Sequence, residues 1–332
     1  MDLLRILSGA VLVCVFILTA FFTRLIIPKL KSMKLGQTIL EIGPRWHKNK
    51  EGTPTMGGIA FISAILLVSV VLVVFCSTVL DEPVFIRLII TVIFAALNGA
   101  IGIIDDMTKF KNHRNEGLSA SQKFLLQLIV AALYLFALSY TGFINTVMPI
   151  PFTNIGLDLK IVYYPMALIV ITGIINSVNL TDGIDGLASS VTMVVGAAFA
   201  VLSFFKSDTE LSFLSSMIIG ACLGFLVYNF YPARRCRGDT GSLFLGAAAV
   251  GCAFILNDPL IILIIGIVYV AESLSVIIQV GSFKLTGKRI FKMSPIHHHF
   301  EKCGWSEIKI VSVFSFVTFV FSAIAVILSV IK

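Results

Sequence analysis

The sequence Asn179-Leu180-Thr181-Asp182-Gly183-Ile184-Asp185-Gly186-Leu187-Ala188 places two carboxylates and an amide between two apolar runs. Each run, residues 161–178 and 187–205, approaches the ~20 residues that cross a bilayer. Because polar side chains are costly beside lipid, we expect this joint at a membrane boundary, where one span ends and the next begins. If the joint is helical, Asp182 and Asp185 share one face. The alternative is a short polar hinge with no further role.

The composition indicates a membrane protein. Of the 332 residues, 58% are hydrophobic and 13% are charged, about half the charged fraction of a typical soluble protein. We therefore predict an all-α, polytopic membrane protein in which residues 1–332 form a single integral-membrane domain. Ten apolar runs are expected to be spans: residues 3–27, 57–79, 84–104, 122–140, 161–178, 187–205, 211–230, 242–256, 260–280 and 309–331.

Basic residues are divided unevenly between the two ends of these spans. Of the 25 Lys and Arg residues, 20 fall in loops and span ends at 24–56, 105–123, 232–241 and 281–309. Because cytoplasmic loops concentrate Lys and Arg, we expect these four loops in the cytoplasm and both termini on the opposite side. The joint at 179–186 and all five histidines fall on the same face. The net charge of +7 follows from this bias and does not indicate a nucleic-acid partner.

The third predicted span ends in adjacent carboxylates, Asp105 and Asp106, followed by Lys109. Two neighbouring anions repel unless a cation or nearby lysines neutralise them. Lys123, at the start of the next span, is a second candidate for that neutralisation. A hard, oxygen-seeking ion such as Mg²⁺ is the usual partner of such carboxylates where phosphates also bind. A solvated helix end is the competing interpretation.

The eighth predicted span opens with Gly238-Asp239-Thr240-Gly241-Ser242, after three arginines in residues 232–237. A helix start with glycines and hydroxyls binds anions well, and arginines attract phosphorylated ligands. Asp239 is expected either to cap the helix or to ligate a metal.

The loop after the ninth span contains Ser294-Pro295-Ile296-His297-His298-His299-Phe300-Glu301. Three consecutive histidines cannot all face one metal from a helix or strand, so we do not expect a zinc site. We expect imidazoles that hydrogen-bond phosphate or sugar oxygens, with an incidental surface loop as the alternative. Glu272 and Gln279 are seven residues apart in the ninth span, and are expected to point into the bundle towards this loop.

The segment Lys48-Asn49-Lys50-Glu51-Gly52-Thr53-Pro54-Thr55-Met56-Gly57-Gly58 joins the first basic loop to the second span. Lys50 and the hydroxyls of Thr53 and Thr55 at a helix start suit a phosphate group, although a plain membrane anchor would look the same. With these residues, five aspartates, three lysines and the histidines gather at one membrane face. This pattern predicts a site for Mg²⁺ and a pyrophosphate beside lipid, and phosphoryl transfer onto a lipid carrier as the reaction class.

The motifs at residues 52–58, 105–106, 179–188, 238–243 and 295–301, in this order along the chain, resemble those of the polyprenyl-phosphate N-acetylhexosamine-1-phosphate transferases. The resemblance covers the whole chain, and the His-His-His-Phe-Glu form is more similar to the muramoyl-pentapeptide branch than to the N-acetylglucosamine branch. It implies transfer from UDP-N-acetylmuramoyl-pentapeptide to undecaprenyl phosphate, giving lipid I and UMP, with Mg²⁺ required. It also implies ten spans in a bacterial plasma membrane, a cytoplasmic active site and a homodimer.

The resemblance also implies roles for individual residues. Asp105, Asp106 and Asp239 correspond to the catalytic carboxylates, with Asp239 and Asp106 as Mg²⁺ ligands and Asp105 as the group that activates the lipid phosphate. Either an aspartate attacks the donor first or the lipid phosphate attacks directly. The implied substrate-binding residues are Lys50, Thr53, Thr55, Lys109, Lys123, Asn179, Asp182, Asp185, Arg237, Gly238, Gln279, His297, His298 and His299.

One position departs from the family pattern. An aromatic residue that stacks on uracil commonly precedes the Gly-Asp-Thr-Gly-Ser motif, whereas this chain has Cys236-Arg237. We expect the base to be held otherwise, by stacking on an arginine such as Arg237 or on another aromatic residue.

Two other functions would share some of these features. A transferase for UDP-N-acetylglucosamine would share the carboxylate motifs and differ mainly in the histidine loop and the sugar pocket. A cation-coupled transporter would need acids near the bilayer centre, whereas here they cluster at one edge.

Overall fold

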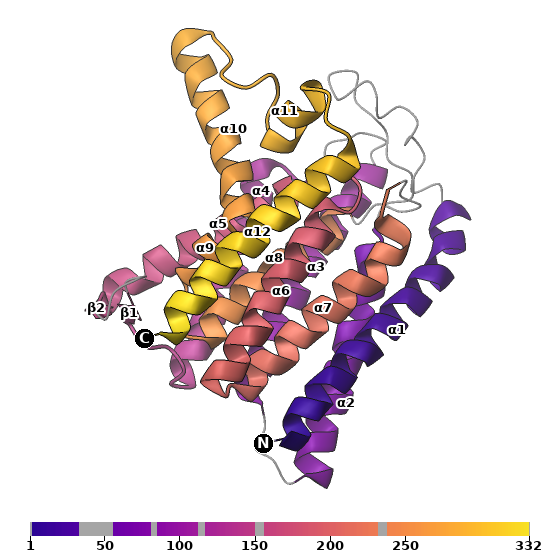
Figure 1. The fold of residues 1–332 in the computed structure, drawn as a ribbon, viewed down its shortest axis with the longest axis vertical. Coiled ribbons are helices and arrows are strands. Elements are labelled where there is room, and N and C mark those ends of the chain that lie inside the picture. The colour runs from indigo at the N-terminus through magenta and orange to yellow at the C-terminus, as the bar shows by residue number, and fades with distance from the viewer. Residues whose placement is uncertain are drawn as a thin grey trace.

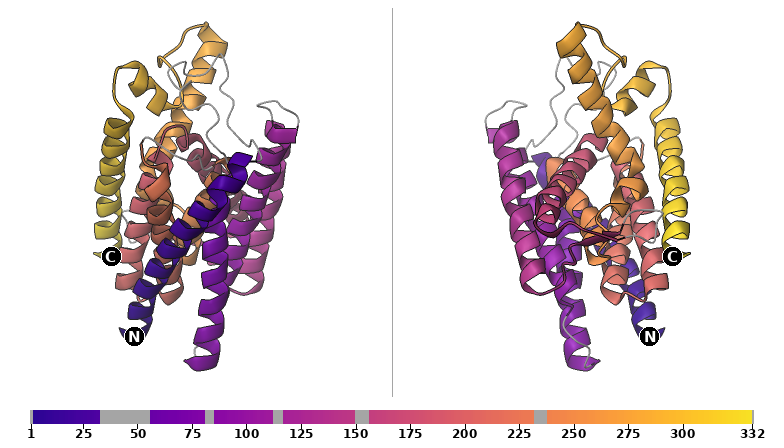
Figure 2. Two further views of the ribbon diagram at one scale, coloured as in Figure 1. Left: turned by 90° about the vertical axis from the view of Figure 1, so that its right-hand side faces the viewer. Right: turned by 90° about the vertical axis from the view of Figure 1, so that its left-hand side faces the viewer.

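The protein is a bundle of membrane-length helices, seen in a computed structural model that describes residues 2–32, 56–80, 85–111, 117–149, 156–231 and 238–331. Within these ranges ten helices are long and apolar enough to cross a membrane, which confirms the predicted all-α, multi-pass architecture. Both termini lie at one end of the bundle, and the short helix α11 lies at the other (Figures 1 and 2).

In chain order the elements are α1 (Asp2–Ser32), α2 (Gly58–Val79), α3 (Ile86–Lys111), α4 (Ala120–Tyr140), β1 (Val147–Pro149), β2 (Gly156–Asp158), η2 (Lys160–Val162), α5 (Tyr163–Thr181), α6 (Leu187–Lys206), α7 (Thr209–Asn229), α8 (Gly238–Ile255), α9 (Ile261–Ile265), α10 (Ile267–Thr286), α11 (Ile296–Lys302) and α12 (Glu307–Val330). The antiparallel pair β1–β2 lies between α4 and α5.

Helix α8 forms the centre of the bundle. Every residue from 240 to 255 is buried, and the sequence in this stretch is rich in Gly, Ala and Ser, which let neighbouring backbones approach closely. Helices α2, α3, α5, α6 and α7 all pack against α8. Two glycines permit the closest approaches: a Cβ on Gly58 would lie 2.4 Å from Gly241 Cα, and one on Gly102 would lie 2.4 Å from the Asp239 carbonyl oxygen. The first turn of α8 is therefore fixed between α2 and α3.

Three helices extend beyond or depart from the predicted apolar runs. Helix α8 begins at Gly238, four residues before the apolar run of 242–256, so the Gly-Asp-Thr-Gly-Ser motif opens the helix as predicted. The ninth span was predicted as residues 260–280, but the chain breaks at Gly266 and the membrane-length helix α10 continues to Thr286. The third span continues through Asp105 and Asp106 to Lys111. Hydropathy alone does not locate these ends, because polar residues at a helix end can be satisfied by neighbouring helices.

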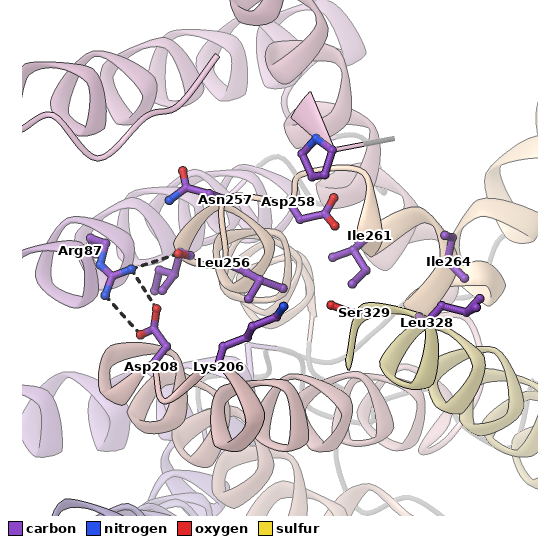
Figure 3. A pocket seen from close by; sticks show the side chains of 13 residues that line it. Arg87, Lys206, Asp208, Leu256, Asn257, Asp258, Ile261, Ile264, Leu328 and Ser329 are labelled. Atoms are coloured by element: carbon purple, nitrogen blue, oxygen red, sulfur yellow. Dashed lines mark hydrogen bonds and ion pairs between the residues drawn. The ribbon is translucent and has the colours of Figure 1, made fainter. Parts of the chain in front are cut away.

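A cluster of charged residues joins the start of α3, the start of α7 and the end of α8, and Figure 3 shows its Arg87 and Asp208. Arg87, at the start of α3, donates to Asp208 at 2.9 Å, to Glu210 at 2.7 Å and to the Ile255 carbonyl at the end of α8. A cavity of about 330 Å³ adjoins this cluster, and Lys206 points into it. Arg87 and Asp105 are about 25 Å apart along α3 at roughly 1.5 Å per residue, so this cavity is remote from the aspartates.

Candidate active site

Asp239, in the first turn of α8, lies at the centre of a polar network at the other end of the bundle. Its Oδ2 accepts hydrogen bonds from Lys109 Nζ at 2.6 Å and from Lys123 Nζ at 2.9 Å. Its Oδ1 accepts one from Asn179 Nδ2 at 2.8 Å. Helices α3, α4, α5 and α8 thus each contribute one side chain to the network. The structure brings together residues that are up to 130 positions apart in the sequence.

Asp106 caps the helix that carries Asp239. Its Oδ1 accepts the Asp239 backbone N–H at 3.2 Å, and its Oδ2 accepts both the N–H and the hydroxyl of Thr240, at 3.0 and 2.7 Å. The first N–H groups of a helix have no partner within it, and a carboxylate near them is also favoured by the helix dipole. Gly238 has a φ of +70°, and a Cβ there would lie 2.6 Å from Asp106 Oδ2. The capping role that we considered for Asp239 therefore belongs to Asp106.

Asp105 is buried beside the same lysine. Its Oδ2 lies 2.7 Å from Lys109 Nζ, and its Oδ1 accepts the Leu118 backbone N–H at 2.9 Å. The chain entering α4 is therefore tied to the end of α3. A Cβ on Gly117 would lie 2.5 Å from Asp105 Oδ1, so the carboxylate fits only beside a glycine.

The three carboxylates form a group suited to a hard cation. Asp105, Asp106 and Asp239 each offer an oxygen within 4.8 Å of the others, and no other such group of His, Cys, Asp and Glu occurs in the described parts of the chain. Oxygen ligands are those that Mg²⁺ prefers. With Lys109 and Lys123, the group carries a formal charge of −1, which leaves it able to take a divalent cation. The donor set therefore fits the predicted ion.

The joint between α5 and α6 is a turn, so the condition under which Asp182 and Asp185 would share a helical face is not met. Asp182 follows the last residue of α5 and is half-buried, whereas Asp185 is buried. The Asp185 backbone N–H donates to Glu307 Oε2 at 3.1 Å, at the start of α12. Gly186 ends the turn with a φ of +77°, which explains why the helix does not continue.

The three histidines lie in α11, and each hydrogen-bonds a different group of the protein. His297 is fully buried against Glu272, with 3.1 Å between Nδ1 and Oε2. His298 contacts Glu301, one turn further along α11. His299 Nδ1 accepts the Lys292 backbone N–H at 3.1 Å.

Gln279 fastens the loop that precedes α11. Its Oε1 accepts the N–H groups of Ile290 and Phe291 at 3.0 and 2.9 Å, and its Nε2 donates to the Phe291 carbonyl at 3.0 Å. Glu272 and Gln279 therefore both face the histidine segment, which confirms their predicted direction.

Lys50, Thr53, Thr55 and Arg237 lie outside the described residues. Sequence reasoning missed the partners of the aspartates, which include Thr240 for Asp106 and the Leu118 N–H for Asp105. It also missed Ser242, which accepts from Asn179 Nδ2 at 2.7 Å, and Glu307. The hydroxyls of the Gly-Asp-Thr-Gly-Ser motif were the available signal, but the sequence does not say which carboxylate they meet.

Comparison with known proteins gives consistent matches. A family model described as Glycosyl transferase family 4 matches residues 87–257, just over half of the chain. A phospho-N-acetylmuramoyl-pentapeptide-transferase signature matches residues 50–62. A protein of that name from Clostridium perfringens (strain SM101 / Type A) is 46% identical over 311 residues, 93% of each chain. This chain belongs to the phospho-N-acetylmuramoyl-pentapeptide-transferase family.

Further relatives of the same name agree with this assignment. The phospho-N-acetylmuramoyl-pentapeptide-transferase of Staphylococcus carnosus (strain TM300) is 43% identical over 301 residues, which cover 90% of this chain and 92% of the relative. The one from Clostridium acetobutylicum is 48% identical over 304 residues, covering 91% and 92%. The predicted family is confirmed. The matched family model spans the network around Asp239, and the signature spans Lys50, Thr53 and Thr55.

Proposed function

We propose that this protein transfers the phospho-N-acetylmuramoyl-pentapeptide group from UDP-N-acetylmuramoyl-pentapeptide to undecaprenyl phosphate, giving lipid I and UMP in peptidoglycan synthesis. The observation that carries the proposal is the Asp239 carboxylate, which Lys109, Lys123 and Asn179 contact at one end of a membrane bundle. In the reaction, an oxygen of the lipid phosphate bonds to the phosphorus that bears the sugar. The P–O bond to the uridylyl phosphate breaks, and UMP leaves with its electron pair.

The two lysines supply positive charge where the substrates carry negative charge. The donor brings a pyrophosphate and the acceptor a phosphate, and both need cationic hydrogen-bond donors. Lys109 and Lys123 are partly exposed and already orient towards one carboxylate oxygen. Asp105 is the proposed base for the lipid phosphate, since its position beside Lys109 keeps it close to the anion that the lysine attracts.

Mg²⁺ is the proposed cofactor. Asp239 and Asp106 would hold it, with Asp105 as the third carboxylate of the group. When bound, the ion would neutralise charge that develops on the phosphoryl oxygens. The protein holds three carboxylates close together. Asp106 is fixed by its hydrogen bonds to the start of α8, and Lys109 and Lys123 reduce the repulsion between the negative charges.

The proposed location is the cytoplasmic face of a bacterial plasma membrane. Lys109, near the end of α3, and Lys123, near the start of α4, contact Asp239, and residues 284–309 surround α11 at the same end of the bundle. Arg87 at the start of α3, Lys160 just before α5 and Lys206 at the end of α6 lie at the opposite helix ends. This division supports an inward-facing site by the positive-inside rule. We also propose a homodimer, on the basis of the family resemblance.

Release of UMP by detergent-purified protein tests the function. The reaction would contain UDP-N-acetylmuramoyl-pentapeptide, undecaprenyl phosphate and Mg²⁺, with parallel samples containing chelator, Asp239→Asn, or UDP-N-acetylglucosamine as the donor. We expect turnover with the first donor only, abolished by the chelator and by the substitution. Turnover with UDP-N-acetylglucosamine alone would assign the sister reaction, and turnover in the presence of chelator would remove the Mg²⁺ proposal.

A further inference from the structure

A buried Glu–His pair links α10 to α11 at the edge of the site. Glu272 and His297 are both fully buried, and His297 Nδ1 lies 3.1 Å from Glu272 Oε2. This distance is that of a hydrogen bond between the imidazole and the carboxylate. The hydrogen bond therefore fixes both the position and the orientation of the imidazole.

The opposite edge of the imidazole lies against the turn between α5 and α6. A Cβ built on Gly183 would lie 2.1 Å from His297 Nε2 and 2.6 Å from Cε1, and the three nearest atoms all belong to this ring. Gly183 does not have a left-handed backbone conformation, so the imidazole is what excludes a side chain there. His297 Nε2 is buried and has no hydrogen-bond partner among the described residues. On this side the ring lies against Gly183 of the turn, and the His298 ring lies beside it with 4.1 Å between the ring centroids.

The same turn is also bonded to α12. The Asp185 backbone N–H donates to Glu307 Oε2, in the first turn of α12. Residues 182–186 thus rest on two supports from the C-terminal part of the chain, the His297 ring and the Glu307 carboxylate. These residues include both aspartates that we expect to bind the donor.

We propose that His297 is a positioning residue, fixed by Glu272, whose ring sets the place of the Asp182–Gly186 turn and thereby the affinity for the UDP-linked donor. The inference deepens the proposed function and rests on it. It removes His297 from the residues expected to touch substrate, because the ring nitrogen that is not bonded to Glu272 is covered by Gly183. His298 and His299, which are only partly buried, remain as candidates for that contact.

A size-compensation experiment tests this inference. Gly183→Ala would force the turn away from the ring, and we expect a KM for UDP-N-acetylmuramoyl-pentapeptide about tenfold higher, with kcat changed less than about threefold. His297→Ala should raise the same KM by a similar factor. The double variant should be no worse than His297→Ala alone, because the new methyl group enters the space that the ring has left. Gly173→Ala is the matched control, since Gly173 lies in α5 with nothing within 4 Å of an added Cβ.

Variants of Glu272 test whether this residue fixes the His297 ring. Glu272→Gln keeps an acceptor for Nδ1 and should leave the KM within about threefold, whereas Glu272→Ala should match His297→Ala and add nothing to it. The inference would be overturned if the donor KM of either double variant rose by the product of the two single-variant factors. It would also be overturned if kcat fell while the donor KM stayed unchanged. Failure of the unsubstituted protein to release UMP would instead reject the proposed function, so the two failures are distinguishable.

Discussion

Asp106 accepts the backbone N–H of Asp239, at 3.2 Å from its Oδ1, so one aspartate of the site orients the helix on which the other is carried. The second oxygen of Asp106 is occupied by Thr240. Of the adjacent pair in the sequence, Asp105 faces a lysine and Asp106 faces the start of a helix. The two aspartates therefore have different tasks despite their adjacency.

Removal of this cap should reduce both stability and activity. Loss of a helix cap costs about 0.5–2 kcal/mol, and Asp106→Ala removes three hydrogen bonds at once, so we expect a loss near about 2 kcal/mol. UMP release should fall at least about a hundredfold, because Asp239 loses its fixed position. Thermal unfolding in detergent measures the first effect. Unchanged unfolding with abolished activity would mean that Asp106 acts on substrate or metal alone.

Lys109 and Lys123 should control how tightly the site takes a divalent cation. Lys109→Met changes the formal charge of the group from −1 to −2, so the Mg²⁺ concentration for half-maximal rate should fall about tenfold, or about 1.4 kcal/mol. The KM for the anionic donor should rise in the same variant. Lys288→Met, an exposed lysine at the same end of the bundle, is the control and should change neither value. An increased Mg²⁺ requirement in Lys109→Met would contradict the electrostatic argument.

Asn179 should not tolerate an acid. Its Nδ2 donates to Asp239 Oδ1 and to Ser242 Oγ, so Asn179→Asp would place a fourth carboxylate about 3 Å from the central one. We expect a loss of about a hundredfold or more in kcat, measured by UMP release. Ser242→Ala removes only one acceptor of the same amide, and its activity should remain within about fivefold of the starting protein. Equal losses in the two variants would point to general damage to α8.

The charged cluster at the opposite end should affect stability without affecting chemistry. Arg87→Met leaves Asp208 and Glu210 without their partner in a mostly buried place, which should cost about 3 kcal/mol. Lys206→Met changes a cation that lines the same cavity but has no ion pair among the described residues, and should cost less than about 0.5 kcal/mol. The specific activity of the folded fraction should be unchanged in both. A lower kcat in Arg87→Met would reveal coupling along α3.

The fold and the membership of the network were largely predictable. Hydropathy identified the ten membrane-length helices, and the positions of Asp105, Asp106, Asn179 and Asp239 at helix ends predicted that they share one face. Charged residues are rare in the apolar runs of this chain, so the few that occur there can be recognised in the sequence as candidate site residues. Their positions in the sequence do not show which of their atoms form hydrogen bonds or ion pairs with one another.

The pairwise contacts were not predictable, for physical reasons. Whether Asp239 or Asp106 caps α8 depends on how closely α3 approaches, which Gly102 permits through a contact with a residue 137 positions away. The turn at residues 182–186 depends on the conformation of Gly186 and on supports from His297 and Glu307. Local periodicity contains none of this information, because each contact joins segments distant in the chain.

The helices that carry the site residues differ in how much of their surface is buried. Of the most apolar stretch of α8, 89% is buried, against 28% for α10, which projects beyond the bundle with α11 beside it (Figure 2). Helix α8, which carries Asp239, is surrounded by α2, α3, α5, α6 and α7, so its side chains cannot move without displacing these helices. Helix α11, which carries the histidines, packs against α10 and α12, and its His297 lies against the turn between α5 and α6. A substitution at an exposed position of α10 is therefore expected to leave the bundle intact, whereas a substitution within α8 is expected to disturb it.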